Sequence, residues 1–206
     1  MRRTVVALGA GVLVLAGCSS TSSGDSVLVE SGQAAVSDVF RVSQQEIADD
    51  VGLVLVGLGQ PPGEPPAGLA SATTERVVLY RLIDSFAEAN GVDVTRTEVE
   101  EGLEELAAAN GGQDGLREAA LSAGIPEEAL ERTIRTNLLV TGIGSGINPS
   151  GDIPAQLESA RVALSEYSES IDVAVAPRYG TWDDQTLAII PGSSLTEPSG
   201  QEQATP

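Results

Sequence analysis

Apolar side chains recur every three or four positions through most of the chain, and this spacing predicts a mainly α-helical protein. One such stripe combines Ile47, Val51 and Leu55, and another combines Leu82, Ile83 and Phe86. About six helices are expected on this basis. They begin after Ser43, near Ala70, after Thr95, at Asp114, at Pro126 and at Ile153.

The expected helices are bounded by capping and stop residues. Ser43 with Glu46, and Thr95 with Glu98, have the spacing of a capping box, in which each side chain bonds the backbone N–H of the other residue. Gly91 is placed to end the long helix over 70–90. The glutamates over 98–105 lie on one helix and are interpreted as a solvated face.

Glycine-rich segments are expected to interrupt the helices. Gly111 to Gly115 is interpreted as a turn between two helices. Gly142 to Gly151 is interpreted as a linker. A phosphate-binding loop is not indicated there, because this segment follows a helix and no helix begins directly after it.

Short strands are expected near the two ends of the helical region. Residues 34–36 and 39–42 form one strand or two, and residues 171–175 alternate as a further strand, followed by a turn at 177–180. No repeat of fixed period is present. Residues 185–206 are expected to be a tail, disordered from Ser193, where Ser, Pro and Gln dominate.

The N-terminus carries two arginines and then an apolar run over 5–17, the pattern of a secretory signal peptide. The run is shorter than the about 20 residues that a membrane span needs. It ends in a sequence that resembles a bacterial lipobox, Leu15, Ala16, Gly17 and Cys18.

The lipobox resemblance implies that residues 1–17 are removed and that Cys18 carries a diacylglycerol and further acyl chains such as palmitate. The protein would then be anchored on the extracytoplasmic face of the cell membrane. Residues 18–33, rich in Ser, Thr and Gly, would be a flexible tether. The alternative is that Cys18 is an ordinary buried thiol.

Composition excludes several kinds of chemistry. The 206 residues include 30 Asp and Glu and 11 basic residues, all of them Arg, and the net charge is −19. Without the leader, 9 Arg oppose 30 acids, which gives a net charge of −21.

Nucleic acid is an unfavourable partner for such an acidic chain. Without His or Lys and with one Cys, imidazole-based catalysis, a lysine Schiff base, a disulfide and a thiolate metal site are excluded. The use of Arg throughout is typical of high-GC genomes such as those of actinobacteria.

An ordered series of segments resembles the N-terminal domain of SurA-like periplasmic chaperones of the parvulin-type foldase family. It comprises 79–83, 90–95, Glu98-Val99, Gly111-Gly112, Leu116, 123–125, Leu130, Arg135 and Leu138-Leu139, with a return through Val173 to Gly180. The resemblance implies a helical cradle over residues 34–184, closed by a final helix and strand over 153–180.

The same resemblance implies that the catalytic domain of these foldases is missing. Relatives commonly insert a parvulin domain after the Leu-Leu helix, whereas here only 13 residues, 140–152, separate Leu139 from Ile153. Parvulin sites usually contain His, which this chain lacks. A non-enzymatic protein without cofactor or metal is therefore expected.

The expected function is that of a lipid-anchored chaperone-like protein which binds unfolded or extended segments of exported proteins. Candidate contact residues are Val54 and Leu58, in the apolar run over 51–59, with Tyr179 and Trp182. Core packing of Tyr167, Tyr179 and Trp182 is the alternative for the aromatic residues. The alternatives for the whole protein are an interaction lipoprotein with one folded envelope partner and a residual prolyl isomerase.

Overall fold

The computed structural model describes residues 28–61, 63 and 65–192 of the chain. The described part is mainly α-helical, which confirms the expected class. Its elements are β1 (Gln33–Val36), β2 (Arg41–Ser43), α1 (Gln44–Gly57), α2 (Leu69–Asn90), α3 (Arg96–Ala109), α4 (Gln113–Ser122), the 3₁₀ turn η1 (Glu127–Ala129), α5 (Leu130–Ile147), α6 (Ile153–Ser170), β3 (Ala174–Val175), β4 (Thr181–Asp183) and β5 (Ala188–Ile190).

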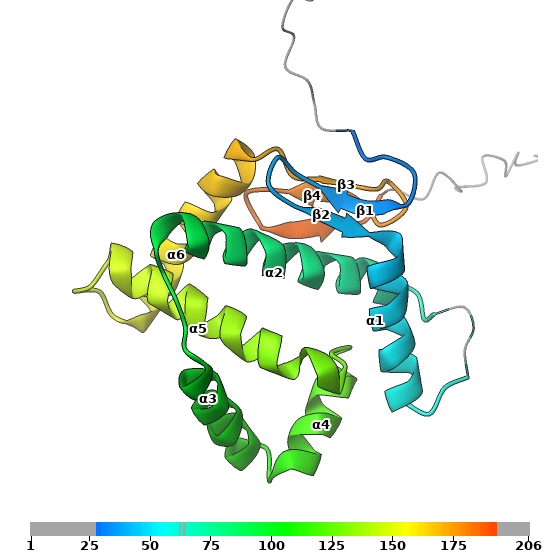
Figure 1. The fold of residues 1–206 in the computed structure, drawn as a ribbon, viewed down its shortest axis with the longest axis horizontal. Coiled ribbons are helices and arrows are strands. Elements are labelled where there is room, and N and C mark those ends of the chain that lie inside the picture. Colours follow the sequence, from blue (N-terminus) through cyan, green and yellow to red (C-terminus); the bar gives the residue numbers. More distant parts are fainter. Residues whose placement is uncertain (1–27, 62, 64, 193–206) are drawn as a thin grey trace, which may run out of the picture.

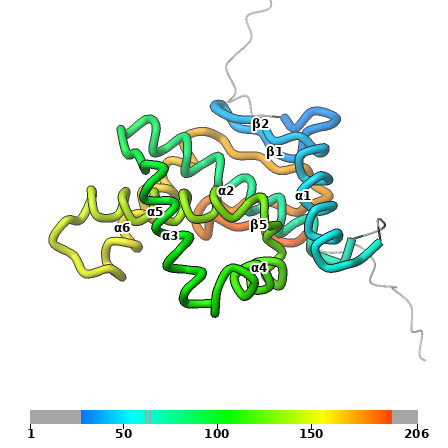
Figure 2. The backbone as a smooth tube through the Cα atoms, turned by 60° about the horizontal axis from the view of Figure 1, so that its bottom comes forward, coloured from blue at the N-terminus to red at the C-terminus, as the bar shows by residue number. Residues whose placement is uncertain are grey.

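Helix α2 lies at the centre of the molecule and contributes to both of its apolar cores. One core lies between α1, α2 and the strands and includes Val78 and Leu82. The other lies between α2, α5 and α6 and includes Leu139 and Ile143. Helices α3 and α4 lie on the side of the molecule away from the strands (Figures 1 and 2). The apolar stripes of α1, α5 and α6 therefore converge on one central helix.

The expected strand pairing between the two ends of the helical region is present. Strand β1 is central in a three-stranded antiparallel sheet, between β2 and β3. Val36 pairs with Arg41 of β2 on one side and with Ala174 of β3 on the other. The hairpin between β1 and β2 is closed by buried Ser37, whose Oγ accepts hydrogen bonds from the backbone N–H groups of residues 39 and 40.

A second hairpin, β4–β5, shows that the expected domain boundary at position 184 is wrong. Ile189 of β5 is buried, and its backbone N–H donates to Glu75 Oε2 of α2 at 2.7 Å. Gly180, at φ 127°, allows β5 to approach, since a Cβ there would lie 2.5 Å from the Ile190 carbonyl oxygen. The fold therefore includes residues 185–190, which the sequence analysis assigned to the tail.

The expected tether over 18–33 is also too long at its C-terminal end. The N–H of Gln33 donates to the Glu30 carbonyl at 3.1 Å, and the N–H of Gln44 donates to the Gly32 carbonyl at 2.9 Å. Gly32 adopts φ 90°, a conformation that glycine tolerates at this turn. Residues 30–33 thus belong to the folded domain.

The interpretation of the glycine-rich segment after position 142 as a linker is wrong, because α5 continues to Ile147. The glycines allow α5 to pack closely against its neighbours. A Cβ on Gly144 would lie 2.3 Å from the backbone oxygen of Gln156 on α6, and one on Gly142 would lie 3.2 Å from Val92 Cγ1. Only residues 148–152 connect the two helices, and Asp152 caps α6 through a bond from the Ala155 N–H.

The two predicted capping boxes differ in outcome. At α3 both halves form, since Thr95 accepts from the Glu98 N–H and Glu98 accepts from the Thr95 N–H. At α1 the Ser43 hydroxyl accepts from the Glu46 N–H at 3.0 Å, but the Glu46 carboxylate pairs with Arg81 of α2 at 3.0 Å instead. The second half of that box is therefore replaced by a tertiary ion pair.

Candidate functional site

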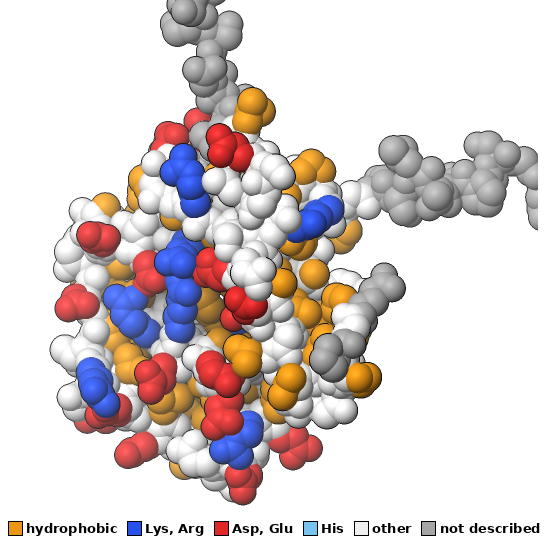
Figure 3. All heavy atoms as spheres, turned by 45° about the vertical axis from the view of Figure 1, so that its right-hand side comes forward, with side chains coloured by type: hydrophobic (Ala, Val, Ile, Leu, Met, Phe, Trp, Pro, Cys, Tyr) orange, Lys and Arg blue, Asp and Glu red, His pale blue; other side chains and the backbone are white. Residues whose placement is uncertain are grey.

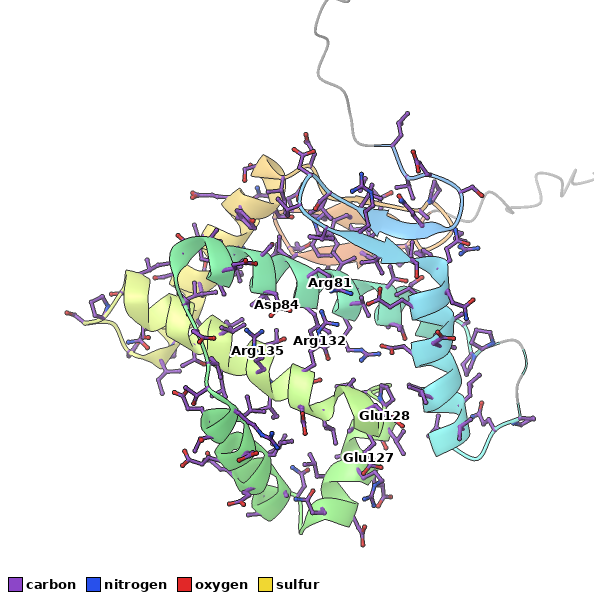
Figure 4. All side chains as sticks on the ribbon, in the orientation of Figure 1. Arg81, Asp84, Glu127, Glu128, Arg132 and Arg135 are labelled. Atoms are coloured by element: carbon purple, nitrogen blue, oxygen red, sulfur yellow. The ribbon has the colours of Figure 1, made fainter. Side chains whose placement is uncertain are left out.

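A cluster of ion pairs lies where α1, α2 and α5 face one another (Figure 4). Asp84 of α2 pairs with two arginines of α5. One is Arg135, and the other is Arg132, one turn nearer the start of α5, whose Nη2 lies 3.6 Å from Asp84 Oδ2. Arg81 of α2 pairs with Glu46 of α1, as described above. These pairs join α2 to α1 and to α5.

Tyr80 lies at the centre of this cluster and is almost completely buried. The guanidinium carbons of Arg132 and Arg76 lie 4.9 and 5.8 Å from its ring centroid. Its hydroxyl lies 2.6 Å from Thr133 Oγ1 on α5. Arg76 also pairs with Asp50 of α1 at 3.3 Å. Tyr80, Arg76 and Arg132 therefore help to hold α2 against α1 and α5.

A cleft of about 570 Å³ opens beside the ion-pair cluster, between α2, α3 and α5. Its charged lining residues are three cations and three carboxylates, so their charges cancel. Asp84 and the two arginines of α5 are already paired with one another. An ionic ligand would have to displace these pairs, so the cluster serves to hold helices together. The lining comprises Asp84, Val94, Arg96, Val99, Glu128, Glu131, Arg132 and Arg135.

One carboxyl in the cluster has a perturbed proton affinity. Burial raises the pKa of Asp50 above its ordinary value of 3.8, and Arg76 opposes this rise. Within residues 28–61, 63 and 65–192, no three His, Cys, Asp or Glu side chains gather as a metal site would require. The five glutamates of α3 are exposed, as expected for a solvated face.

Asp50 is expected to titrate above pH 3.8 in an NMR titration, and Arg76→Gln is expected to move that titration further up, since it removes the largest opposing charge. Between pH 3.8 and the raised pKa, Asp50 is protonated to a greater extent in the folded protein than in the unfolded chain. The contribution of Asp50 to stability therefore falls as pH rises through that window and stays constant above it. Arg161→Gln on α6 is the control, and titration of Asp50 at or below 3.8 would contradict the assignment.

A second and more apolar surface lies on α1. A hollow of about 880 Å³, called the α1 groove here, runs between α1, the following loop, the start of α2 and the turn after β3. The buried side chains of Ile47, Val51 and Leu55 form its floor. Its full lining is Gln44, Gln45, Ile47, Ala48, Val51, Gly52, Leu55, Gly63, Pro65, Ala70, Arg178 and Tyr179.

A smaller hollow of about 440 Å³ continues this surface over the other side of α1. The two hollows share Ala48, Gly52 and Leu55, and no atom lies within 4 Å of a Cβ placed on Gly52. Leu53 and Val56 line the smaller hollow and are 38% and 68% exposed. Figure 3 brings the α1 side of the molecule forward and shows hydrophobic atoms gathered there.

The four contact residues chosen from the sequence have different positions. Leu58 is 46% exposed at the end of α1, whereas Val54 is 1% exposed and faces the core. Tyr179 is also buried and lines the α1 groove with one side. Trp182 is buried, and its Nε1–H donates to Ser168 Oγ at 2.9 Å, which agrees with core packing.

The three expected aromatic residues meet at one apolar core, to which Tyr179 and Trp182 belong and against which Tyr167 packs. Tyr167 also packs edge-to-face against Phe86 with ring centroids 5.3 Å apart. Leu53 and Val56 were not predicted from the sequence as exposed residues. The signal available for them was that residues 53–56 are all apolar, which is more than one buried helix face can accommodate.

Leu15, Ala16, Gly17 and Cys18 of the lipobox lie outside the described residues. Among the helices that are described, none combines the length and the apolar character needed to cross a membrane. Comparison with family models, with curated proteins and with solved structures finds no match. The SurA-like relationship therefore stays a prediction from the sequence.

Proposed function

We propose that this protein is a lipid-anchored, chaperone-like component of the cell envelope that binds unfolded or extended segments of exported proteins and performs no covalent chemistry. The observation that carries the proposal is the apolar surface of α1, where a groove with a buried aliphatic floor lies beside exposed Leu53 and Val56. The SurA-like pattern and the lipobox support the same function from the sequence.

The floor of the α1 groove has the properties that a weak polypeptide site of low sequence selectivity needs. Its floor is aliphatic and has no hydrogen-bonding side chain, so it distinguishes apolar segments by size more than by sequence. A segment that buries about 200 Å² of apolar surface there gains about 5 kcal/mol at ~25 cal/mol per Å². Ordering the segment offsets much of this gain, so rapid release is expected.

The acidic charge fits a protein that keeps an apolar surface exposed. At −21 for the chain without its leader, copies of the protein repel one another, which opposes association through their α1 surfaces. The ion-pair cluster between α1, α2 and α5 fixes α1 on one side, while its apolar outer surface stays open.

Replacing Leu53 and Val56 together by Gln is expected to weaken binding of an unfolded client about tenfold, because two exposed apolar contacts are lost. The measurement is suppression of aggregation of a reduced, unfolded client by the mature chain, with affinity from peptide anisotropy. Leu157→Gln with Val162→Gln on α6 is the matched control, since these side chains are 42% and 41% exposed.

Equal loss in both double variants would show that α1 is not the binding surface. Failure of the unaltered protein to suppress aggregation at a stoichiometric ratio would overturn the proposal. Crosslinking that returns one stoichiometric folded partner would favour the interaction lipoprotein instead. Turnover of a proline peptide by this His-free chain would favour a residual isomerase.

A further inference from the structure

Among the described residues, Arg178 is the one charged side chain that lines the α1 groove. It follows β3 and is exposed. Its guanidinium carbon lies 4.8 Å from the ring centroid of Tyr179, and its Nη2 donates to the Tyr179 hydroxyl at 2.8 Å. These two contacts with a buried ring hold the cation beside the groove.

The Arg178 guanidinium makes no ion pair with any carboxylate of the described residues. In the described part of the chain, Arg41 is the one other arginine without an ion pair. The remaining described arginines all pair with Asp or Glu. A guanidinium has five N–H donors, and Tyr179 accepts from one of them. Arg178 thus retains donors for a carboxylate from another molecule.

We propose that the α1 groove selects apolar polypeptide segments that carry an acidic side chain, whose carboxylate pairs with Arg178. This inference rests on the proposed function, because it assigns a substrate class to the same groove. The apolar side chains of the segment would lie on Ile47, Val51 and Leu55, and the Asp or Glu would lie at the Arg178 end.

The other polar side chains that line the groove within the described residues do not oppose an acidic segment. Gln44 and Gln45 are neutral, and their amide groups donate to the Gln33 carbonyl at 3.1 Å and to Asp49 Oδ1 at 2.7 Å. Asp49 lines the smaller hollow and does not line the groove. The overall negative charge acts at longer range, and salt screens it over about 8 Å at physiological ionic strength. A direct pair with Arg178 is therefore expected to outweigh the distant repulsion.

The test compares three labelled peptides with capped ends, one apolar sequence in which a single flanking position is Glu, Gln or Lys. Anisotropy with the mature chain at 0.15 M salt is expected to show the Glu peptide binding about three- to fivefold more tightly than the Gln peptide, the upper part of the range for a single exposed ion pair. In 0.5 M salt this preference should shrink. The Lys peptide is expected to bind no better than the Gln peptide.

Arg178→Gln is expected to bring the ratio of Glu to Gln affinities close to one, and Arg178→Lys to leave an intermediate ratio, since Lys keeps the charge without the planar fork. Arg41→Gln, at the other arginine outside the ion pairs, should leave the ratio unchanged. Circular dichroism of each variant confirms folding.

The outcomes separate this inference from the function on which it rests. Binding of the Glu and Gln peptides with equal affinity would overturn the acidic preference and leave the proposed function intact. A Glu preference that persists in Arg178→Gln would overturn the assignment to Arg178. Tightest binding of the Lys peptide would show that the overall negative charge dominates, which also overturns the inference. Absence of binding by all three peptides would count against the proposed function itself.

Discussion

Gly144→Ala is expected to lower the free energy of unfolding by about 1–3 kcal/mol, the usual cost of forcing extra volume into a packed interface. The added methyl group would lie 2.3 Å from the backbone oxygen of Gln156. A backbone atom in the first turn of α6 has no rotamer by which to move away, so the two helices must separate. Urea denaturation measures the effect, followed by the fluorescence of Trp182, the single tryptophan of the chain.

Gly146→Ala is the matched control for this prediction. It lies in the same helix two residues later, and no atom lies within 4 Å of a Cβ placed there. Alanine is favoured over glycine inside a helix by about 0.5–1 kcal/mol, so this variant is expected to be as stable as the unaltered protein or slightly more stable. If both variants changed stability in the same direction by the same amount, close approach of α5 and α6 at Gly144 would not explain the glycine.

Ending the chain after Asp184 is expected to lower the free energy of unfolding by about 2–5 kcal/mol, the range for removing a large buried aliphatic side chain. The shortened chain lacks β5, and with it the buried side chain of Ile189 and the hydrogen bond from its N–H to Glu75. Strand β4 would lose its only described partner. Thermal and urea denaturation, monitored by circular dichroism, measure the loss.

A chain ended after Gly192 is the control and is expected to keep the stability of the full-length protein. Marginal stabilities of 5–15 kcal/mol make the difference between the two shortened chains easy to measure. Equal stability of the two would mean that β5 contributes nothing and that the boundary expected from the sequence, at position 184, was adequate.

The helices could be predicted from the sequence because each has an apolar stripe and a defined end. The long stripe around Leu82 and the capping box of Thr95 and Glu98 depend on residues close together in the chain. Gly144 could not be assigned in the same way. Its place in a helix depends on contact with Gln156 of another helix, and local propensity alone favours a break there.

Hairpin β4–β5 was missed for a similar reason. Each of its strands has three residues, too few for a clear alternation, and Ile189 owes its burial to α2. At the candidate site, the apolar run over 51–59 lies on α1, whose surface carries the α1 groove and the smaller hollow. Periodicity did not reveal that Val54 faces inward while Val56 faces outward, because nearly every residue of the run is apolar. The role proposed for Arg178 depends on its position beside α1, which the sequence does not show.

The position of β1 has a consequence for how the chain is made. Val36 pairs with Ala174, so the central strand of the sheet is synthesised first and one of its neighbours almost last. Contacts between residues so distant in the chain are slow to form. Until β3 emerges, β1 has only β2 beside it and presents an unpaired edge to other chains. Folding of this domain therefore finishes only after the helices have been synthesised, and until then the edge of β1 is open to pairing with other chains.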